Sequence, residues 1–232
     1  MRIFLVLSLL LISNFSLARQ AVSGNRFELL SGIRNNSKSQ LFWDKKFNKE
    51  RYVYGKAPSK FLAENYDYIP HGSRVLDIGM GEGRNAVFLA TKGYKVTGVE
   101  ISPIAIRKAK LLAREFDVRI DPVLSSIEDY KVEKNSLDAI ICFYFVDKAI
   151  NEKFFEWLKP GGILIFEAFT KRQESISKDK EIDLGEVFEE GELLKIFPKM
   201  RTLKFEEPLH RKDFTTSIIL QKPRESSSGL QN

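Results

Sequence analysis

Two carboxylates and a run of alternating glycines in the middle of the chain have the spacing of a nucleotide site. In VLDIGMGEGR, residues 75–84, Asp77 ends an apolar run, and the glycines that follow it are Gly79, Gly81 and Gly83. Such a turn lets the backbone approach a ligand closely. Glu100 ends the next apolar run, about 20 residues further on, where a carboxylate can accept hydrogen bonds from both hydroxyls of a ribose.

The spacing of this turn favours S-adenosylmethionine over a dinucleotide. A dinucleotide-binding turn follows G-x-G-x-x-G, and Arg84 stands where its third glycine belongs. The Asp77 carboxylate would also repel a pyrophosphate, whereas it suits a cationic or hydrogen-bond-donating ligand. S-adenosylmethionine offers an adenosine, a sulfonium and an amino-acid tail. An NAD-dependent oxidoreductase is the alternative enzyme class.

The elements around the turn alternate between strands and helices. Apolar runs such as RVLDIG, KVTGVE, LDAIICFYF and ILIFEAF are separated by amphipathic stretches, which is typical of a parallel sheet covered on both faces. Near the end, two apolar stretches at 201–208 and 214–222 follow each other without a helix, so they pair antiparallel if they pair. The pattern predicts an α/β, doubly wound, Rossmann-like domain with a mostly parallel seven-stranded sheet and a C-terminal antiparallel pair.

The two ends of the chain differ from this body. Residues 1–18 resemble a secretory signal, with Arg2 before an apolar run too short to span a bilayer and with Ser16 and Ala18 before the expected cleavage point. We expect a linker at 19–38, the domain at 39–223 and a disordered tail at 224–232. The protein is then exported or periplasmic, or it is anchored by an uncleaved segment and faces the cytoplasm.

Composition narrows the partners. The 232 residues carry a formal net charge of +6, but the basic residues are spread along the chain, which disfavours nucleic-acid binding. The single cysteine, Cys142, excludes an intrachain disulfide and a cysteine-based zinc site, and no metal is expected. Membrane contact is expected only through the N-terminal segment, and the sequence does not indicate an oligomeric state.

VLDIGMGEG matches the first motif of the class I S-adenosylmethionine-dependent methyltransferases throughout, and the chain resembles that family. LKPGGILIFE, residues 158–167, resembles the family's approach to its fifth strand. The resemblance is closest to the small-molecule branch that includes tellurite- and thiopurine-methyltransferase-like proteins, through WDKKFNKERYVYGKAPSKFL at 43–62, GEGRNA, and FEEPLHRKD at 205–213. It implies an enzyme that transfers a methyl group from S-adenosylmethionine to a small molecule.

The resemblance also assigns the remaining site residues. Beside Asp77, the three glycines and Glu100, the cofactor site would include Tyr54, Asn85, Ile101, Ser126, Ile127 and Phe143. Ser126 departs from the family's usual acid at the adenine, so Glu128 or Asp129 is an alternative partner there. Tyr144, His210 and Arg211 would face the methyl acceptor.

Methyl transfer mainly needs alignment and a dry site, because the sulfonium is already an activated leaving group. We expect a small, soft, anionic acceptor, such as a thiolate or chalcogen oxyanion, because the sequence shows no obvious catalytic dyad. His210 and Arg211 would orient it, and the polar segment 170–190 would cover the site. The alternative is a methyltransferase-fold protein that binds the cofactor without turnover.

Overall fold

A computed structural model describes residues 37–176, 187–208 and 214–224 of the chain. The signal-like segment at 1–18, most of the expected linker and residues 225–232 of the expected tail lie outside the described residues. The chain divides into two compact units, Met1–Phe42 and Trp43–Asn232. Helix α2 (Ser37–Phe47) crosses that division, whereas the sheet and the later helices all belong to the second unit. Within the described ranges, no helix is both long and apolar enough to cross a bilayer.

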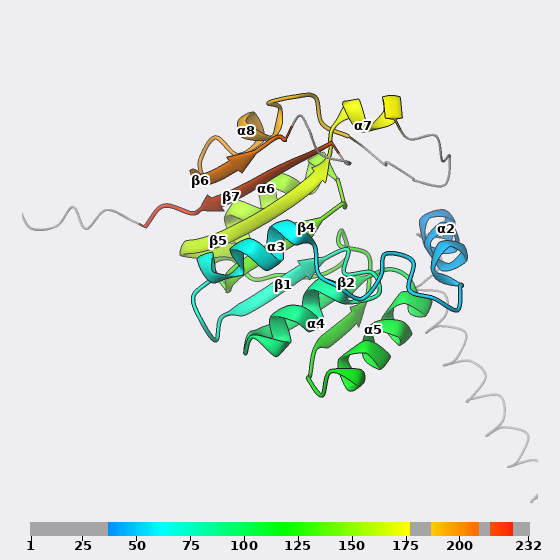
Figure 1. The fold of residues 1–232 in the computed structure, drawn as a ribbon. Coiled ribbons are helices and arrows are strands. Elements are labelled where there is room, and N and C mark those ends of the chain that lie inside the picture. The colour runs from blue at the N-terminus through cyan, green and yellow to red at the C-terminus, as the bar shows by residue number, and fades with distance from the viewer. Residues whose placement is uncertain (1–36, 177–186, 209–213, 225–232) are drawn as a thin grey trace, which may run out of the picture. The chain divides into compact units, whose positions relative to one another are not determined.

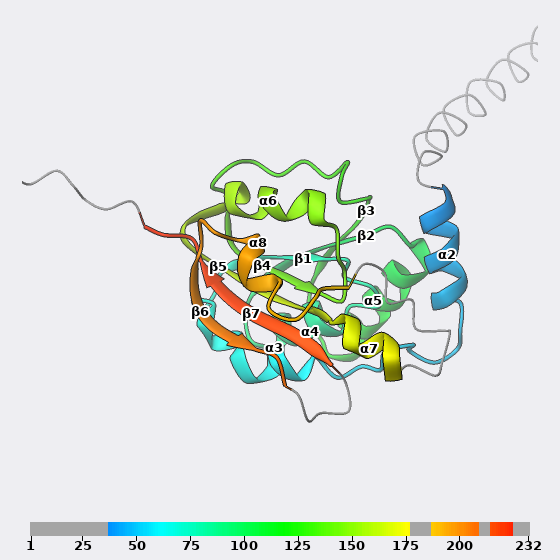
Figure 2. The same cartoon turned by 90° about the horizontal axis from the view of Figure 1, so that it is seen from above.

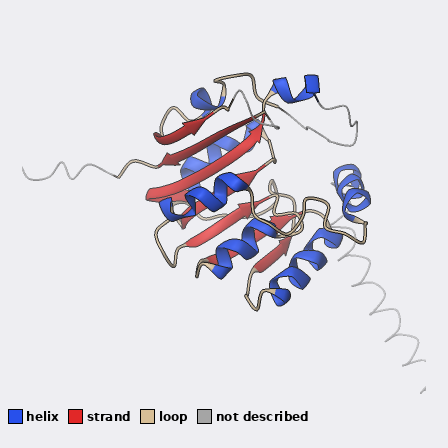
Figure 3. Ribbon diagram, viewed as in Figure 1, coloured by secondary structure: helices blue, strands red, loops and turns tan. Residues whose placement is uncertain are grey.

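A seven-stranded sheet forms the centre of the second unit, as predicted (Figures 1 and 3). The strands are β1 (Arg74–Ile78), β2 (Lys95–Glu100), β3 (Asp121–Leu124), β4 (Leu137–Phe143), β5 (Leu158–Phe169), β6 (Arg201–Glu206) and β7 (Thr215–Gln221). Their spatial order is β3-β2-β1-β4-β5-β7-β6, with β1 to β5 parallel and β7 antiparallel to both β5 and β6. Insertion of an antiparallel β7 separates this order from the dinucleotide-binding order 3-2-1-4-5-6.

Helices cover both faces of the sheet. Figures 1 and 2 show α3, α4 and α5 on one face and α6 and α8 on the other. The helices are α3 (Lys60–Asn65, continued by a 3₁₀ turn at Tyr66–Tyr68), α4 (Arg84–Thr91), α5 (Pro103–Glu115), α6 (Lys148–Trp157), α7 (Lys171–Ile176) and α8 (Leu193–Ile196). This arrangement is the doubly wound architecture that the alternating pattern predicts.

The alternation of side chains along each strand produces two cores. In β1, Leu76 and Ile78 face the core under α6 and α8, whereas Val75 faces the core under α3 and α4. A strand that is buried on both faces needs a nearly continuous apolar sequence. Asp77 interrupts that sequence in β1, and Glu167 interrupts it in β5; both are buried.

Two element boundaries differ from the sequence-based expectation. The fourth strand ends at Phe143, because Tyr144 has a positive φ of 60° and leaves the extended conformation. Helix α6 runs directly into β5, so Pro160 lies inside a strand. Proline is tolerated there because the pairing with β4 skips from Leu158 to Ile163.

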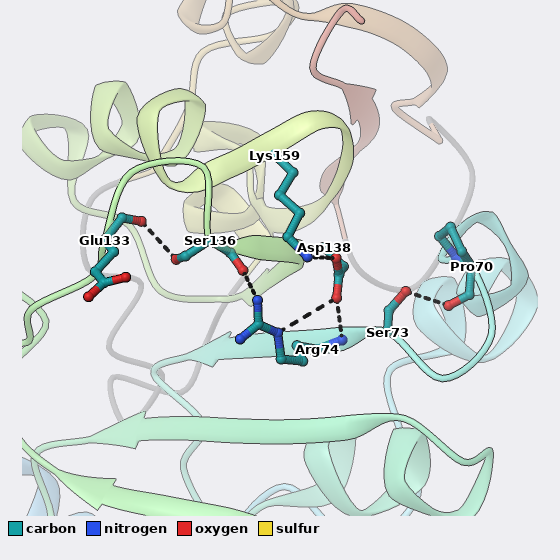
Figure 4. A network of polar contacts seen from close by, with 7 residues as sticks. All are labelled: Pro70, Ser73, Arg74, Glu133, Ser136, Asp138 and Lys159. Carbon is teal, nitrogen blue, oxygen red and sulfur yellow. Dashed lines mark hydrogen bonds and ion pairs between the residues drawn. The ribbon is translucent and has the colours of Figure 1, made fainter.

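A polar network ties together the amino-terminal ends of β1, β4 and β5 (Figure 4). Asp138 accepts a hydrogen bond of 2.8 Å from the Arg74 backbone amide and pairs with Lys159, while the Arg74 guanidinium donates to the Ser136 carbonyl over 2.6 Å. Partial burial raises the pKa of Asp138, but the hydrogen bonds from Lys159 and Arg74 and their charges outweigh it and hold that pKa below its ordinary value. The network fixes strand register at the end of the sheet away from the glycine turn.

Candidate functional site

The glycine turn lies at the carboxyl end of β1, between the strand and α4. Gly79, Gly81 and Gly83 all have positive φ values, of 64°, 58° and 85°, which other residues adopt at a cost. Space is also short at two of them. A Cβ on Gly79 would lie 2.9 Å from the Cβ of Phe145, and one on Gly83 would lie 2.7 Å from the Cβ of Ala109 in α5. The alternating glycines are therefore required by backbone geometry and packing together.

Asp77 is a buried carboxylate at the edge of this turn. Its Oδ2 atom has no hydrogen-bond partner, which is costly for a buried polar group. Burial raises the pKa of Asp77 to about 8, against the lowering effect of the Arg84 charge; the Glu100 charge adds to the rise and the Ala86 amide opposes it. The unpartnered oxygen fits a ligand that brings its own donor, as the sequence predicts.

Glu100, at the end of β2, holds the glycine turn from the other side. Its Oε2 accepts from the Gly81 amide over 2.9 Å, and its Oε1 accepts from the Ser102 amide over 2.8 Å. Burial raises the pKa of Glu100, the amides of Ser102, Gly81 and Ile101 oppose the rise, and the Asp44 charge adds to it. Each oxygen retains a lone pair for a ribose hydroxyl, so the carboxylate fixes the turn and can also bind a nucleoside.

We expect Glu100→Ala to weaken binding of S-adenosylhomocysteine roughly a hundredfold or more, because two charge-assisted hydrogen bonds are lost at about 1.5–3 kcal/mol each. Glu100→Gln keeps the shape and should cost less. Isothermal titration measures both.

A 2′-deoxy analogue separates the ribose contact from the support of the turn. It should bind the parent protein more weakly than S-adenosylhomocysteine does, but lose little further affinity in Glu100→Ala. An equal loss in the two proteins would show that another group binds the ribose.

Residues 51–59, called the strap here, pass beside the glycine turn and are hydrogen-bonded to side chains of the turn and of the start of α4. Asn85 accepts from the Ser59 amide over 2.9 Å, and Arg84 donates to the Tyr54 carbonyl over 3.3 Å. Asn85 is therefore a support for the strap. The half-exposed Tyr54 ring packs edge-on against Phe47 and lies 5.9 Å from the Arg84 guanidinium. These contacts place Tyr54 beside the helix that follows the glycine turn, and its contact with the cofactor stays a prediction.

A buried ion pair, which was not predicted from the sequence, provides a third contact that holds the strap. Glu82, inside the glycine turn, accepts from the Val53 amide over 2.7 Å and from the Lys108 ammonium of α5 over 2.6 Å. Lys108 also donates to the Arg51 carbonyl over 2.9 Å. A glutamate between two glycines was the only signal in the sequence, and its lysine partner is 26 residues away.

On the expected adenine side, Ser126 is used internally. Its hydroxyl donates to Asp129 over 3.0 Å and accepts from the Asp129 amide over 3.3 Å, which closes a turn. Ile127 is buried in the core under α6, and Ile101 is half-buried after β2. The structure groups Ser126 and Asp129 beyond Glu100, where the Ser125 amide donates to the Glu100 carbonyl over 3.1 Å.

The carboxyl ends of β4 and β5 form the other side of the site. Tyr144 directly follows Phe143, and its hydroxyl donates to Glu167 of β5 over 2.7 Å. The Tyr144 ring lies 4.7 Å from the Phe169 ring and 5.7 Å from the Arg84 guanidinium, measured between centres. Arg84 therefore links Tyr144, which the sequence analysis predicts to face the acceptor, to the glycine turn.

Glu167 was missed by the sequence analysis. It accepts from Ser59 of the strap over 2.7 Å and from Ser217 of β7 over 2.8 Å, in addition to Tyr144. The signal was an acidic residue within the otherwise apolar run ILIFEAF. His210 and Arg211, predicted to face the acceptor, lie outside the described residues.

The predicted cover over 170–190 is only partly described, since residues 177–186 lie outside the described ranges. Phe188 is fully buried, and its ring centre lies 5.9 Å from that of Phe166 in β5. Thr170 bridges to it beside the end of β5. Thr170 and Phe188 therefore belong to the core, whereas the predicted cover over the site stays a prediction.

The site residues fit S-adenosylmethionine. The unpartnered Asp77 Oδ2 can accept from the ammonium of its amino-acid tail, and Glu100 can accept from the ribose. When bound, this cofactor supplies an electrophilic methyl group. In the part of the chain that the structure describes, no group of three or more His, Cys, Asp or Glu residues is placed to hold a metal ion.

Comparison with known proteins agrees with this geometry. Residues 75–162 match the family model described as methyltransferase domain. A ubiquinone biosynthesis O-methyltransferase of Xanthomonas axonopodis pv. citri is 32% identical over 108 residues, which is 44% of this chain and 45% of the relative, so the chain spans less than half the length of that curated relative.

Solved structures share the fold. A crystal structure of SAM-dependent methyltransferases from Methanosarcina mazei has a TM-score of 0.56 at 24% identity and covers 69% of this chain and 97% of that one. TehB from Haemophilus influenzae has a TM-score of 0.59 at 20% identity, covering 79% of this chain and 66% of that one. The chain therefore has the class I S-adenosylmethionine-dependent methyltransferase fold, and its residues 75–162 match a methyltransferase domain.

Proposed function

We propose that this protein transfers the methyl group of S-adenosylmethionine to a sulfur or oxygen nucleophile on a small molecule that reacts as an anion. The observation that carries the proposal is a glycine turn flanked by two buried carboxylates on adjacent strands, namely Asp77, whose Oδ2 has no hydrogen-bond partner, and Glu100. The matched curated relatives are named as O-methyltransferases, which supports oxygen as well as sulfur as the attacked atom.

A small acceptor is supported by how little of the described chain lies outside the common fold. The strap crosses the site and is fastened at Val53, Tyr54 and Ser59, which suits an enclosed pocket better than a long groove. The tellurite- and thiopurine-type branch of the sequence resemblance belongs to the same proposal, since both types use small acceptors.

Incubation with S-adenosylmethionine labelled in the methyl group tests this function. The acceptors are benzenethiol, phenylmethanethiol and 4-nitrophenol, with a bulk protein and a bulk RNA as controls. We expect label in a small molecule and none in either macromolecule. Label only in the macromolecules would contradict the small-acceptor proposal.

Titration with S-adenosylhomocysteine and with NAD addresses the two alternatives. Binding of the first and not of the second is expected. Tight cofactor binding with no transfer to any acceptor would favour a binding protein without turnover, whereas binding of NAD alone would favour an oxidoreductase.

A further inference from the structure

Glu167 is a buried carboxylate whose hydrogen bonds, within the described part of the chain, come from neutral hydroxyl groups. Tyr144 and Ser59 both donate to its Oε1 over 2.7 Å, and Ser217 donates to its Oε2 over 2.8 Å. Burying a charged carboxylate is costly, and proteins usually compensate it with a cation. Here the donors are hydroxyl groups, in the place where a cation usually stands.

The position of Glu167 is set by the sheet. In the strand register it stands opposite Phe143 of β4 on one side and Ser217 of β7 on the other. The carboxyl ends of parallel strands meet at one edge, where ligands of open α/β sheets bind. The nucleoside side of the site is at β1 and β2, marked by Asp77 and Glu100, so the β4 and β5 ends are the side left for the methyl acceptor.

Tyr144 connects Glu167 to that space. Its φ of 60° is uncommon for a residue with a large side chain, and strained backbone of this kind is concentrated at functional sites. The residue is 37% exposed even though its hydroxyl is held by a buried carboxylate. A phenol oxygen that donates its own proton keeps lone pairs that can accept another.

The Arg84 side chain of α4 faces this pair. The Arg84 guanidinium lies 5.7 Å from the centre of the Tyr144 ring, and Arg84 also interacts with Asp77. Arg84 contacts the ring face of Tyr144, whereas Glu167 holds its hydroxyl end. A ligand that approaches the Tyr144 hydroxyl is therefore nearer to the Glu167 carboxylate than to the Arg84 guanidinium.

We propose that Tyr144 and Glu167 form a proton-accepting pair, and that the methyl acceptor binds as a neutral thiol or hydroxyl. This inference rests on the proposed function. The acceptor proton moves to the Tyr144 oxygen as the Tyr144 proton moves to Glu167 Oε1. A lone pair on the acceptor sulfur or oxygen forms the bond to the methyl carbon. The carbon–sulfur bond of the cofactor breaks, its electrons stay on sulfur, and S-adenosylhomocysteine remains.

The first test uses a probe that reports its own charge. 4-Nitrophenol is yellow when ionised and colourless when neutral, and it is added to protein loaded with S-adenosylhomocysteine at a pH where the free probe is about half ionised. We expect the bound probe to lose its colour, because the carboxylate disfavours a second negative charge beside it. The parent protein should prefer the neutral form by about tenfold or more, which corresponds to one pKa unit in the bound probe.

Two variants should remove that preference, and a third should keep it. Glu167→Gln removes the charge and Tyr144→Phe removes the accepting oxygen, so the ratio between the two forms should fall toward one in both. Tyr94→Phe is the matched control, because it also removes a phenol hydroxyl that donates a 2.8 Å hydrogen bond, to the Ile69 carbonyl, on a buried ring away from the site.

The second test measures the proton transfer itself. Phenylmethanethiol is mostly protonated at neutral pH, and benzenethiol is mostly ionised. In single turnovers, both site variants should slow methylation of phenylmethanethiol about a hundredfold, as expected for loss of a general base, and methylation of benzenethiol less than about threefold. A purely structural role would slow both thiols equally.

Cofactor affinity separates the possible failures. S-adenosylhomocysteine should bind all variants as it binds the parent protein. Suppose that S-adenosylhomocysteine binds in this way. The proton-accepting pair is then refuted if 4-nitrophenol binds as the yellow anion or does not bind. It is also refuted if the variants slow methylation of the two thiols equally, or if neither thiol is methylated. If the parent protein does not bind S-adenosylhomocysteine, the proposed function itself fails.

Discussion

Asp77→Asn should weaken binding of S-adenosylhomocysteine at least about a hundredfold while stabilising the ligand-free protein. The binding loss follows because a buried carboxylate that accepts from an ammonium is replaced by a neutral amide; breaking a buried charged pair costs about 3–5 kcal/mol. The gain in stability follows from the pKa of Asp77, which burial raises from 3.8 to about 8. The burial of Asp77 therefore lowers the stability of the ligand-free protein when this carboxylate is ionised.

The pH dependence has a definite sign. Between about pH 4 and 8 the folded protein holds a proton on Asp77 that the unfolded chain has released, so the free energy of unfolding falls as pH rises through this window. By pH 9 the penalty is on the order of 6 kcal/mol. Asp77→Asn should lack this decline. Urea denaturation from pH 5 to 9 measures it, with Asp121→Asn, an exposed aspartate in β3, as the control.

Ligand binding should change with pH in the opposite direction. The ammonium of S-adenosylhomocysteine pairs with the ionised carboxylate, so binding releases the proton that Asp77 holds and affinity increases as pH rises toward 8. Parallel stability curves for parent and Asp77→Asn, together with an affinity that does not depend on pH, would contradict this account of the site.

Lys108→Met should lower the free energy of unfolding by about 3–5 kcal/mol, because it leaves the buried Glu82 carboxylate without its cation. The side chains of Glu82 and Lys108 are 3% and 13% exposed. The matched control is Lys56→Met, which breaks a pair of equal length with Glu115 whose side chains are 43% and 49% exposed. That pair should contribute less than about 1 kcal/mol.

The double variant Glu82→Gln, Lys108→Met identifies the origin of the loss. If the uncompensated charge is the cause, the double variant should be more stable than Lys108→Met alone, and urea denaturation of all four proteins measures the difference. The strap should also be cleaved faster by trypsin in Lys108→Met, because Lys108 holds the Arg51 carbonyl. A double variant no more stable than Lys108→Met would assign the loss to packing of the lysine stem.

Local patterns in the sequence determined the fold and one side of the site. The continuous apolar runs require strands buried on both faces, and the missing helix before β7 forces an antiparallel pair. The glycine spacing predicted the turn, because its positive φ angles are a property of those residues alone. Asp77 and Glu100 were also predicted from a local pattern, because each stands at the end of an apolar run in the sequence.

The tertiary structure alone decided which distant side chains meet. Glu167 is joined to Ser59, 108 residues away, and to Ser217, 50 residues away, and Glu82 of the glycine turn is joined to Lys108 of α5. Such pairings depend on strand order and register, which bring the ends of β4, β5 and β7 together. The charge state of Asp77 likewise follows from burial, which a local pattern does not measure. The sequence therefore predicted the glycine turn between Asp77 and Glu100, whereas the contacts around Glu167 arise between segments far apart in the chain.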